Sequence, residues 1–151
     1  MNSTKQQDYH RSSGIMEIPL KFAWASLIYL LIGSTMGVVM LLTSETIKPS
    51  HAHVLLIGFI SMMIFGVGYH LLPVFAGTDL HSIGLAELQF WLQNTGLVGL
   101  AFTMPYRYEN ESYRIGTIFF GAISLLAIYI FVYNVARSII IPEEKKKSKF
   151  P

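Results

Sequence analysis

Four long stretches almost free of charge constrain this chain more than any other feature. Residues 22–42 and 115–136 contain no Asp, Glu, Lys or Arg, and neither do residues 54–76. Residues 82–104 contain a single one, Glu87. A helix needs about 20 apolar residues to cross the apolar core of a bilayer, which is about 30 Å thick. The sequence therefore predicts an all-α integral membrane protein with four transmembrane helices.

Composition excludes the soluble classes of protein. Of the 151 residues, 52% are hydrophobic and 13% are charged, whereas soluble domains carry roughly a quarter charged residues. A chain this short cannot bury so much apolar surface in a soluble fold. The sequence contains no cysteine, which excludes disulfides, iron–sulfur clusters and covalent attachment of c-type haem.

Short polar segments with turn residues join the apolar stretches: Lys48-Pro49-Ser50, Gly77-Thr78-Asp79 and residues 107–111. Short connections favour antiparallel neighbours, so we expect an up-down-up-down bundle. The predicted organisation is a polar tail, a four-helix transmembrane domain that keeps its first span, and a basic tail. These parts cover residues 1–17, 18–140 and 141–151.

Basic residues predict the orientation of the bundle. The side that holds both termini carries more Lys and Arg than the opposite side, where the basic residues are Lys48, Arg107 and Arg114. The positive-inside rule then places both termini in the cytoplasm, with the protein in the cell (inner) membrane. The lysine-rich C-terminal tail fits this rule, and we expect no nucleic-acid partner.

The second stretch and the residues just before it hold three of the five histidines, His51, His53 and His70. Residues two positions apart on a helix point to nearly opposite faces, so the first two imidazoles predict two separate sites. His70 lies about 25 Å further along the axis. The other spans contain no histidine, so a haem held by two imidazoles near the outer surface needs its second ligand from another subunit. Met36 and Met40 of the first span are a weaker alternative.

Other polar residues leave several interpretations open. Glu45 with His51 and His53 is an alternative copper or zinc site at the outer surface. His70 and His81 flank the loop that contains Asp79, where they form either a weak metal site or ordinary solvated side chains.

Three further features lie within the spans. Glu87, about 7 Å inside the third span, is protonated, a proton relay or close to water. Gln89 and Gln93 share one helix face, which favours interhelical hydrogen bonds. Gly33 and Gly37 form a GxxxG motif that allows a neighbouring helix to approach closely.

The second span carries a family resemblance. His51-Ala-His53, the glycine-rich Gly66-Val-Gly68, and His70-Leu-Leu-Pro73-Val-Phe75-Ala-Gly77 resemble the tenth helix of the catalytic subunit of haem–copper oxidases. The third and fourth spans resemble the eleventh and twelfth helices. The likeness covers about residues 50–138.

In that family twelve helices form three arcs of four, and the second helix of each arc supplies metal ligands. The resemblance implies that this chain corresponds to the last arc, helices nine to twelve. It also implies that His51 matches the proximal ligand of the high-spin haem and His53 an axial ligand of the low-spin haem. His70 matches a histidine that is not a ligand.

The copper ligands of the family belong to the middle arc, and the partner histidine of the low-spin haem belongs to the first arc. A single chain therefore lacks a complete binuclear centre, and the likeness does not support oxygen reduction to water. A closed homo-oligomer, a dimer or a trimer, restores haem ligation between subunits. Its haem is bound by His53 of two copies, or by His51 of one copy and His53 of the next.

The sequence thus predicts a homo-oligomer that binds b-type haem near the outer face and transfers electrons between a respiratory-chain donor and acceptor. The alternatives are an O₂- or NO-binding haem sensor or reductase, a copper- or zinc-handling membrane protein, and a structural respiratory subunit. No catalytic residue is assigned.

Overall fold

A computed structural model describes residues 3–42 and 47–140, with side chains from residue 17 onward. This part of the chain is helical and contains no strand, which confirms the all-α prediction. The elements are α1 (Ser3–Leu42), α2 (Lys48–His53), η1 (Val54–Ser61), α3 (Met62–Ala76), α4 (Ile83–Thr103), η2 (Met104–Tyr106) and α5 (Glu111–Ile140). Because α2, η1 and α3 follow one another without a break, we call them together the second rod.

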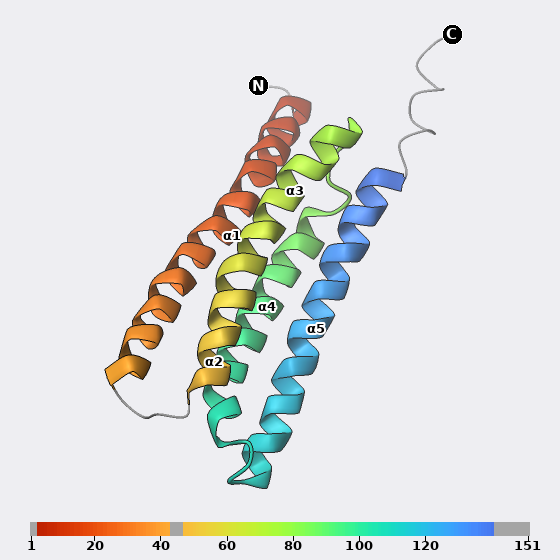
Figure 1. Ribbon diagram of the computed structural model, residues 1–151. Helices are drawn as coiled ribbons and strands as arrows, with labels where there is room; N and C mark the ends of the chain where they lie inside the picture. The colour runs from red at the N-terminus through yellow and green to blue at the C-terminus, as the bar shows by residue number, and fades with distance from the viewer. Residues whose placement is uncertain (1–2, 43–46, 141–151) are drawn as a thin grey trace.

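The long helices lie alongside one another, and consecutive ones run in opposite directions (Figure 1). α1 packs on the second rod, while α4 packs mainly on α5, and α3 also touches α5. The beginning of α1 and the end of α5 lie at the same end of the bundle (Figure 1). α1 extends back to Ser3, so most of the predicted N-terminal tail is helical. The basic tail, 141–151, lies outside the described residues.

Within residues 3–42 and 47–140, three helices are long and apolar enough to cross a membrane: Glu17–Leu42, Lys48–Ala76 and Glu111–Ile140. Their apolar side chains point outward in large numbers; Leu31 is 70% exposed and Leu41 86%. Apolar surface of this extent is rare on soluble proteins and matches contact with lipid. The fourth predicted span, 82–104, coincides with α4, whose polar residues lower its hydropathy. Its membrane crossing stays a prediction.

The second rod is not a uniform α-helix. It begins at Lys48, six residues before the predicted span, and Pro49 occupies its first turn, where a missing N–H costs nothing. η1 is a π-helix of eight residues. Within it the Ser61 hydroxyl donates to the carbonyl of Leu56, five residues earlier, at 2.9 Å. π-helical segments are rare and are found disproportionately at functional sites.

Glycines set the closest helix contacts. A Cβ at Gly33 would lie 2.4 Å from Leu55 Cδ2, so α1 and the second rod pack as closely as the GxxxG motif predicts. A Cβ at Gly96 of α4 would lie 2.8 Å from the backbone nitrogen of Ser124 in α5. At Gly96 the neighbour is backbone, which cannot move aside, whereas at Gly33 it is the flexible side chain of Leu55.

Aromatic side chains fill the core around the middle of α1. Phe22 of α1 is fully buried. Its ring lies 6.3 Å from that of Phe65, 5.6 Å from Tyr69 and 5.1 Å from Phe90. One side chain thus links α1 to both α3 and α4. Rings at these separations contribute attraction beyond their buried area.

The turn between α3 and α4 is held by α5. Gly77 ends α3 with a positive φ of 65°, as the predicted turn requires. Beyond it, Asn134 Oδ1 accepts from the Ser82 backbone N–H at 3.0 Å, and its Nδ2 donates to the Ser82 carbonyl at 2.8 Å. Ser138 Oγ accepts from the His81 backbone N–H at 2.8 Å. These bonds fix where α4 begins relative to α5.

We expect Gly96→Ala to lower the free energy of unfolding by about 1–3 kcal/mol, because the new methyl group meets α5 backbone that cannot move aside. The measurement is thermal unfolding in detergent. Gly121→Ala is the matched control in the same interface, since its Cβ would lie 3.8 Å from Leu100 Cδ2, an ordinary contact. Equal stability of the two variants would contradict the prediction.

Candidate functional site

The two histidines of the His-x-His motif lie in α2, at the start of the second rod, and both are half-buried. His51 Nδ1 lies 3.0 Å from the carbonyl oxygen of Gly33 in α1. His53 Nδ1 lies 2.8 Å from the carbonyl oxygen of Pro49, one turn earlier in the same helix. Each ring is therefore held at one nitrogen by a backbone acceptor.

These contacts decide which ring nitrogen carries the proton. A carbonyl oxygen only accepts hydrogen bonds, so Nδ1 of His51 and of His53 must be the donor. In the neutral ring Nε2 then keeps a free lone pair. Metal-binding histidines almost always show this arrangement, with the other nitrogen donating to a carbonyl, carboxylate or water. Both imidazoles are thus in the tautomer that a metal requires at Nε2.

The two rings have different surroundings. His51 contacts α1 at Gly37, where a Cβ would come within 3.1 Å of its Cε1. Both contacts of His51, with Gly33 and Gly37, are made to the GxxxG motif of α1. The hydrogen bond of His53 stays within α2. Among the described residues, no group of three or more His, Cys, Asp or Glu side chains could hold a metal ion. Glu45 of the alternative site lies outside the described residues.

The weaker candidates lie elsewhere. His70 is exposed on α3 and lines a small cavity of 280 Å³ against α1, with Pro19 and Gly66 among its neighbours. His81 is exposed in the turn before α4, where its ring lies 6.1 Å from that of Tyr133. The structure groups neither of them with the His-x-His motif.

Glu87 has a partner that its position in the sequence does not reveal. Its carboxylate forms an ion pair with Lys21 of α1, and both side chains are partly exposed. The ion pair joins α1 to α4.

The glutamines of α4 are fully buried at its interface with α5. Gln93 Nε2 donates to Ser124 Oγ at 2.6 Å, which is the interhelical bond that was predicted. The amide of Gln89 has no hydrogen-bond partner within the described part of the chain. Sequence reasoning missed Asn134, which holds the start of α4, although a polar residue inside an apolar span is a signal of such a role.

We expect ring ¹⁵N chemical shifts to place the proton of neutral His51 and His53 on Nδ1. Free imidazole side chains prefer the proton on Nε2, so a proton on Nδ1 would be due to the carbonyl contacts. The measurement is NMR of histidine-labelled protein at alkaline pH, with exposed His70 as the internal control. A proton on Nε2 of both motif histidines would contradict the geometry.

No model of a known protein family matches the chain. The chain is similar to the Cbb3-type cytochrome c oxidase subunit CcoN1 of Stutzerimonas stutzeri, with 43% identity over 86 residues. The match covers 50% of this chain but only 18% of the relative. It confirms the resemblance to the catalytic subunit of haem–copper oxidases, and together with the three apolar helices it indicates a membrane protein related to part of such a subunit.

Proposed function

We propose that this chain is a four-span membrane protein that binds b-type haem through Nε2 of His53 and His51 and transfers electrons. The observation that carries the proposal is the carbonyl contact at Nδ1 of each ring, at 2.8 Å for His53 and 3.0 Å for His51. It leaves the ligating nitrogen unprotonated before any metal binds. The similarity to an oxidase subunit supports haem as the group.

Nε2 of His53 and Nε2 of His51 would be the nitrogen ligands of a haem. A haem bound there would supply a one-electron couple whose potential depends on its ligands and burial. The Gly33 carbonyl and Gly37 contact the His51 ring, and the Pro49 carbonyl contacts the His53 ring. Ligation by two nitrogens would favour electron transfer over binding of a gas.

The second axial ligand comes from another copy of the chain. His51 and His53 are two positions apart in α2, so their rings cannot lie on opposite faces of one haem. Two copies of His53, or His51 and His53 of neighbouring copies, satisfy the coordination. A dimer or a trimer with closed symmetry is the simplest assembly that does so.

The proposed membrane arrangement includes α4 as the fourth span, in an up-down-up-down bundle with both termini in the cytoplasm. The close packing of α4 on α5 at Gly96 supports this, because α5 is itself apolar enough to cross. The Lys and Arg distribution then puts the histidine site toward the outer face of the inner membrane. Respiratory-chain proteins are the proposed electron donor and acceptor.

The deciding measurement is the visible spectrum of the purified protein, oxidised and then reduced with dithionite. We expect sharp α and β bands that CO does not shift. His53→Ala should remove most of the haem, and His51→Ala should lower its content or change its coordination. His70→Ala, on the same rod but far from the site, is the matched control and should leave the spectrum unchanged.

Other outcomes overturn the proposal in different ways. A broad reduced spectrum that shifts with CO replaces electron transfer with gas binding. A protein that purifies without haem, and takes up none when haem is added, removes haem binding altogether. Bound copper or zinc in that protein would support the metal-handling alternative.

A further inference from the structure

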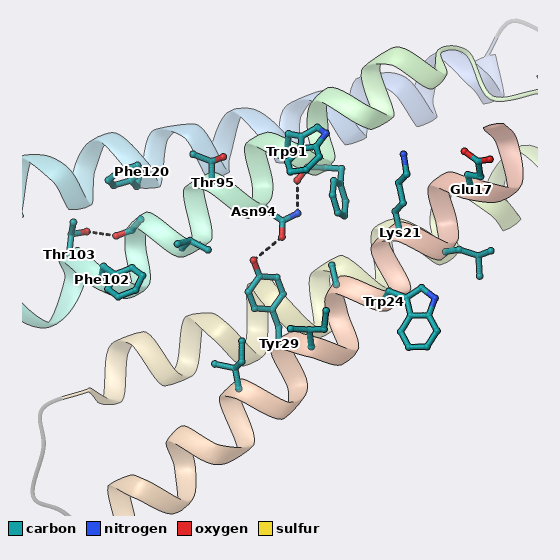
Figure 2. A pocket seen from close by; sticks show the side chains of 17 residues that line it. Glu17, Lys21, Trp24, Tyr29, Trp91, Asn94, Thr95, Phe102, Thr103 and Phe120 are labelled. Carbon is teal, nitrogen blue, oxygen red and sulfur yellow. Dashed lines mark hydrogen bonds between the residues drawn. The ribbon is translucent and has the colours of Figure 1, made fainter.

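A long groove of 1210 Å³ lies between α1 and α4 (Figure 2). α1 and α4 diverge along it, as Figure 2 shows, from a narrow end near Lys21 to a wide end near Phe102. Apolar side chains form most of its lining, among them Trp24, Ile28 and Trp91. Neither His51 nor His53 lines it, so the groove is distinct from the proposed haem site.

Three polar side chains of the groove are hydrogen-bonded within the bundle. Tyr29 donates its hydroxyl proton to Asn94 Oδ1 at 2.7 Å, and Asn94 Nδ2 donates to the Phe90 carbonyl at 2.7 Å. Thr103 donates to the Gly99 carbonyl at 2.8 Å. Most of the remaining lining is apolar, which favours a hydrocarbon occupant. A quinone head group, which needs hydrogen-bond donors, finds the Tyr29 and Thr103 hydroxyls and the Asn94 amide engaged.

The shape of the groove also disfavours a helix from a second copy. Helices associate in membranes through small residues that allow their backbones to approach. The α1 wall presents bulky side chains instead, including Trp24 and Ile28. On α4, Gly96 packs against Ser124 of α5, and Gly99, which lines the groove, is covered by the ring of Phe120. A flexible chain fits this groove better than a helix does.

Charges gather at the narrow end. Lys21 and Glu17 line it, and Lys21 is paired with Glu87. Among the side chains that the structure describes there, one ammonium accompanies two carboxylates. A phosphate can pair with Lys21, while an ammonium group can pair with the carboxylates. A zwitterionic head group satisfies both signs, whereas an anionic head group meets an excess of negative charge.

The dimensions agree with a lipid chain in one leaflet. From Lys21 to Ile32, the last α1 residue that lines the groove, α1 rises about 17 Å. Half of the apolar core of a bilayer is about 15 Å thick. The charged end thus lies at head-group depth when the apolar part lies in the leaflet.

We propose that the groove binds one acyl chain of phosphatidylethanolamine, with the phosphate at Lys21 and the ammonium at Glu17 and Glu87. An ammonium with N–H groups forms charge-assisted hydrogen bonds with carboxylates. The proposal rests on the membrane crossing of α1 and α4 that the proposed function includes. It does not depend on haem.

The two tryptophans of the chain, Trp24 and Trp91, both line the groove and are 67% and 65% exposed. Their fluorescence therefore reports occupancy when lipids with brominated chains quench it. The protein is reconstituted in mixtures where either phosphatidylethanolamine or phosphatidylglycerol carries the bromine. We expect phosphatidylethanolamine to be preferred two- to fivefold, which matches ion pairs worth about 0.4–1 kcal/mol.

The Glu17→Gln variant should reduce this preference toward one. Glu111→Gln is the matched control, because Glu111 is also an exposed carboxylate but lies at the far end of the bundle, outside the groove. It should leave the preference unchanged. Equal quenching by both lipids, a preference for phosphatidylglycerol, or displacement of brominated lipid by an added prenylquinone would each overturn the proposal.

A tryptophan reporter on α5 distinguishes failure of the lipid proposal from failure of the proposed membrane arrangement. Phe119, 59% exposed on α5, is replaced by Trp in a chain whose native tryptophans are Phe. If this reporter is quenched but the native pair is not, the groove is covered by protein and the lipid proposal fails alone. If no tryptophan is quenched, the membrane arrangement fails as well.

Discussion

The close approach of α1 to the second rod at Gly33 and Gly37 places the candidate site. In lipid, helices gain little from burying apolar surface, so packing and hydrogen bonds must hold them together. The missing side chains at these glycines bring the α1 backbone within 3.0 Å of His51 Nδ1. The same contact therefore joins the helices and selects the tautomer of the ring. Without it His51 would be an ordinary interfacial histidine.

The rest of the bundle divides into a tightly packed side and an open side. α4 and α5 meet backbone to backbone at Gly96, and Asn134 fixes the start of α4 through both backbone groups of Ser82. α1 meets α4 at fewer points, chiefly Lys21–Glu87 and Tyr29–Asn94. On the packed side, α4 and α5 also contact the second rod. The open side leaves the groove that we assign to lipid.

The proposed haem site and the proposed lipid site use different physics. At the histidines, hydrogen bonds from Nδ1 to backbone carbonyls leave the lone pair of each Nε2 available to a metal. At the groove, the lining is mostly apolar and favours a hydrocarbon chain, and charged side chains lie at one end. The two proposals share the membrane arrangement of the helices and nothing else. The π-helix η1 follows His53 directly, and its wider turn sets the register in which the remainder of the second rod faces α1 and α4.

The helices, the turn at Gly77 and the close approach at Gly33 and Gly37 could be predicted from the sequence, because each depends on residues near one another in the chain. So could the His-x-His motif and the family resemblance. The partner of Glu87 could not, since Lys21 lies 66 positions away. Nor could the π-helical register or the groove between α1 and α4. These depend on how each helix is rotated and tilted against its neighbours, and hydropathy carries no information about rotation in a helix that is apolar on every side.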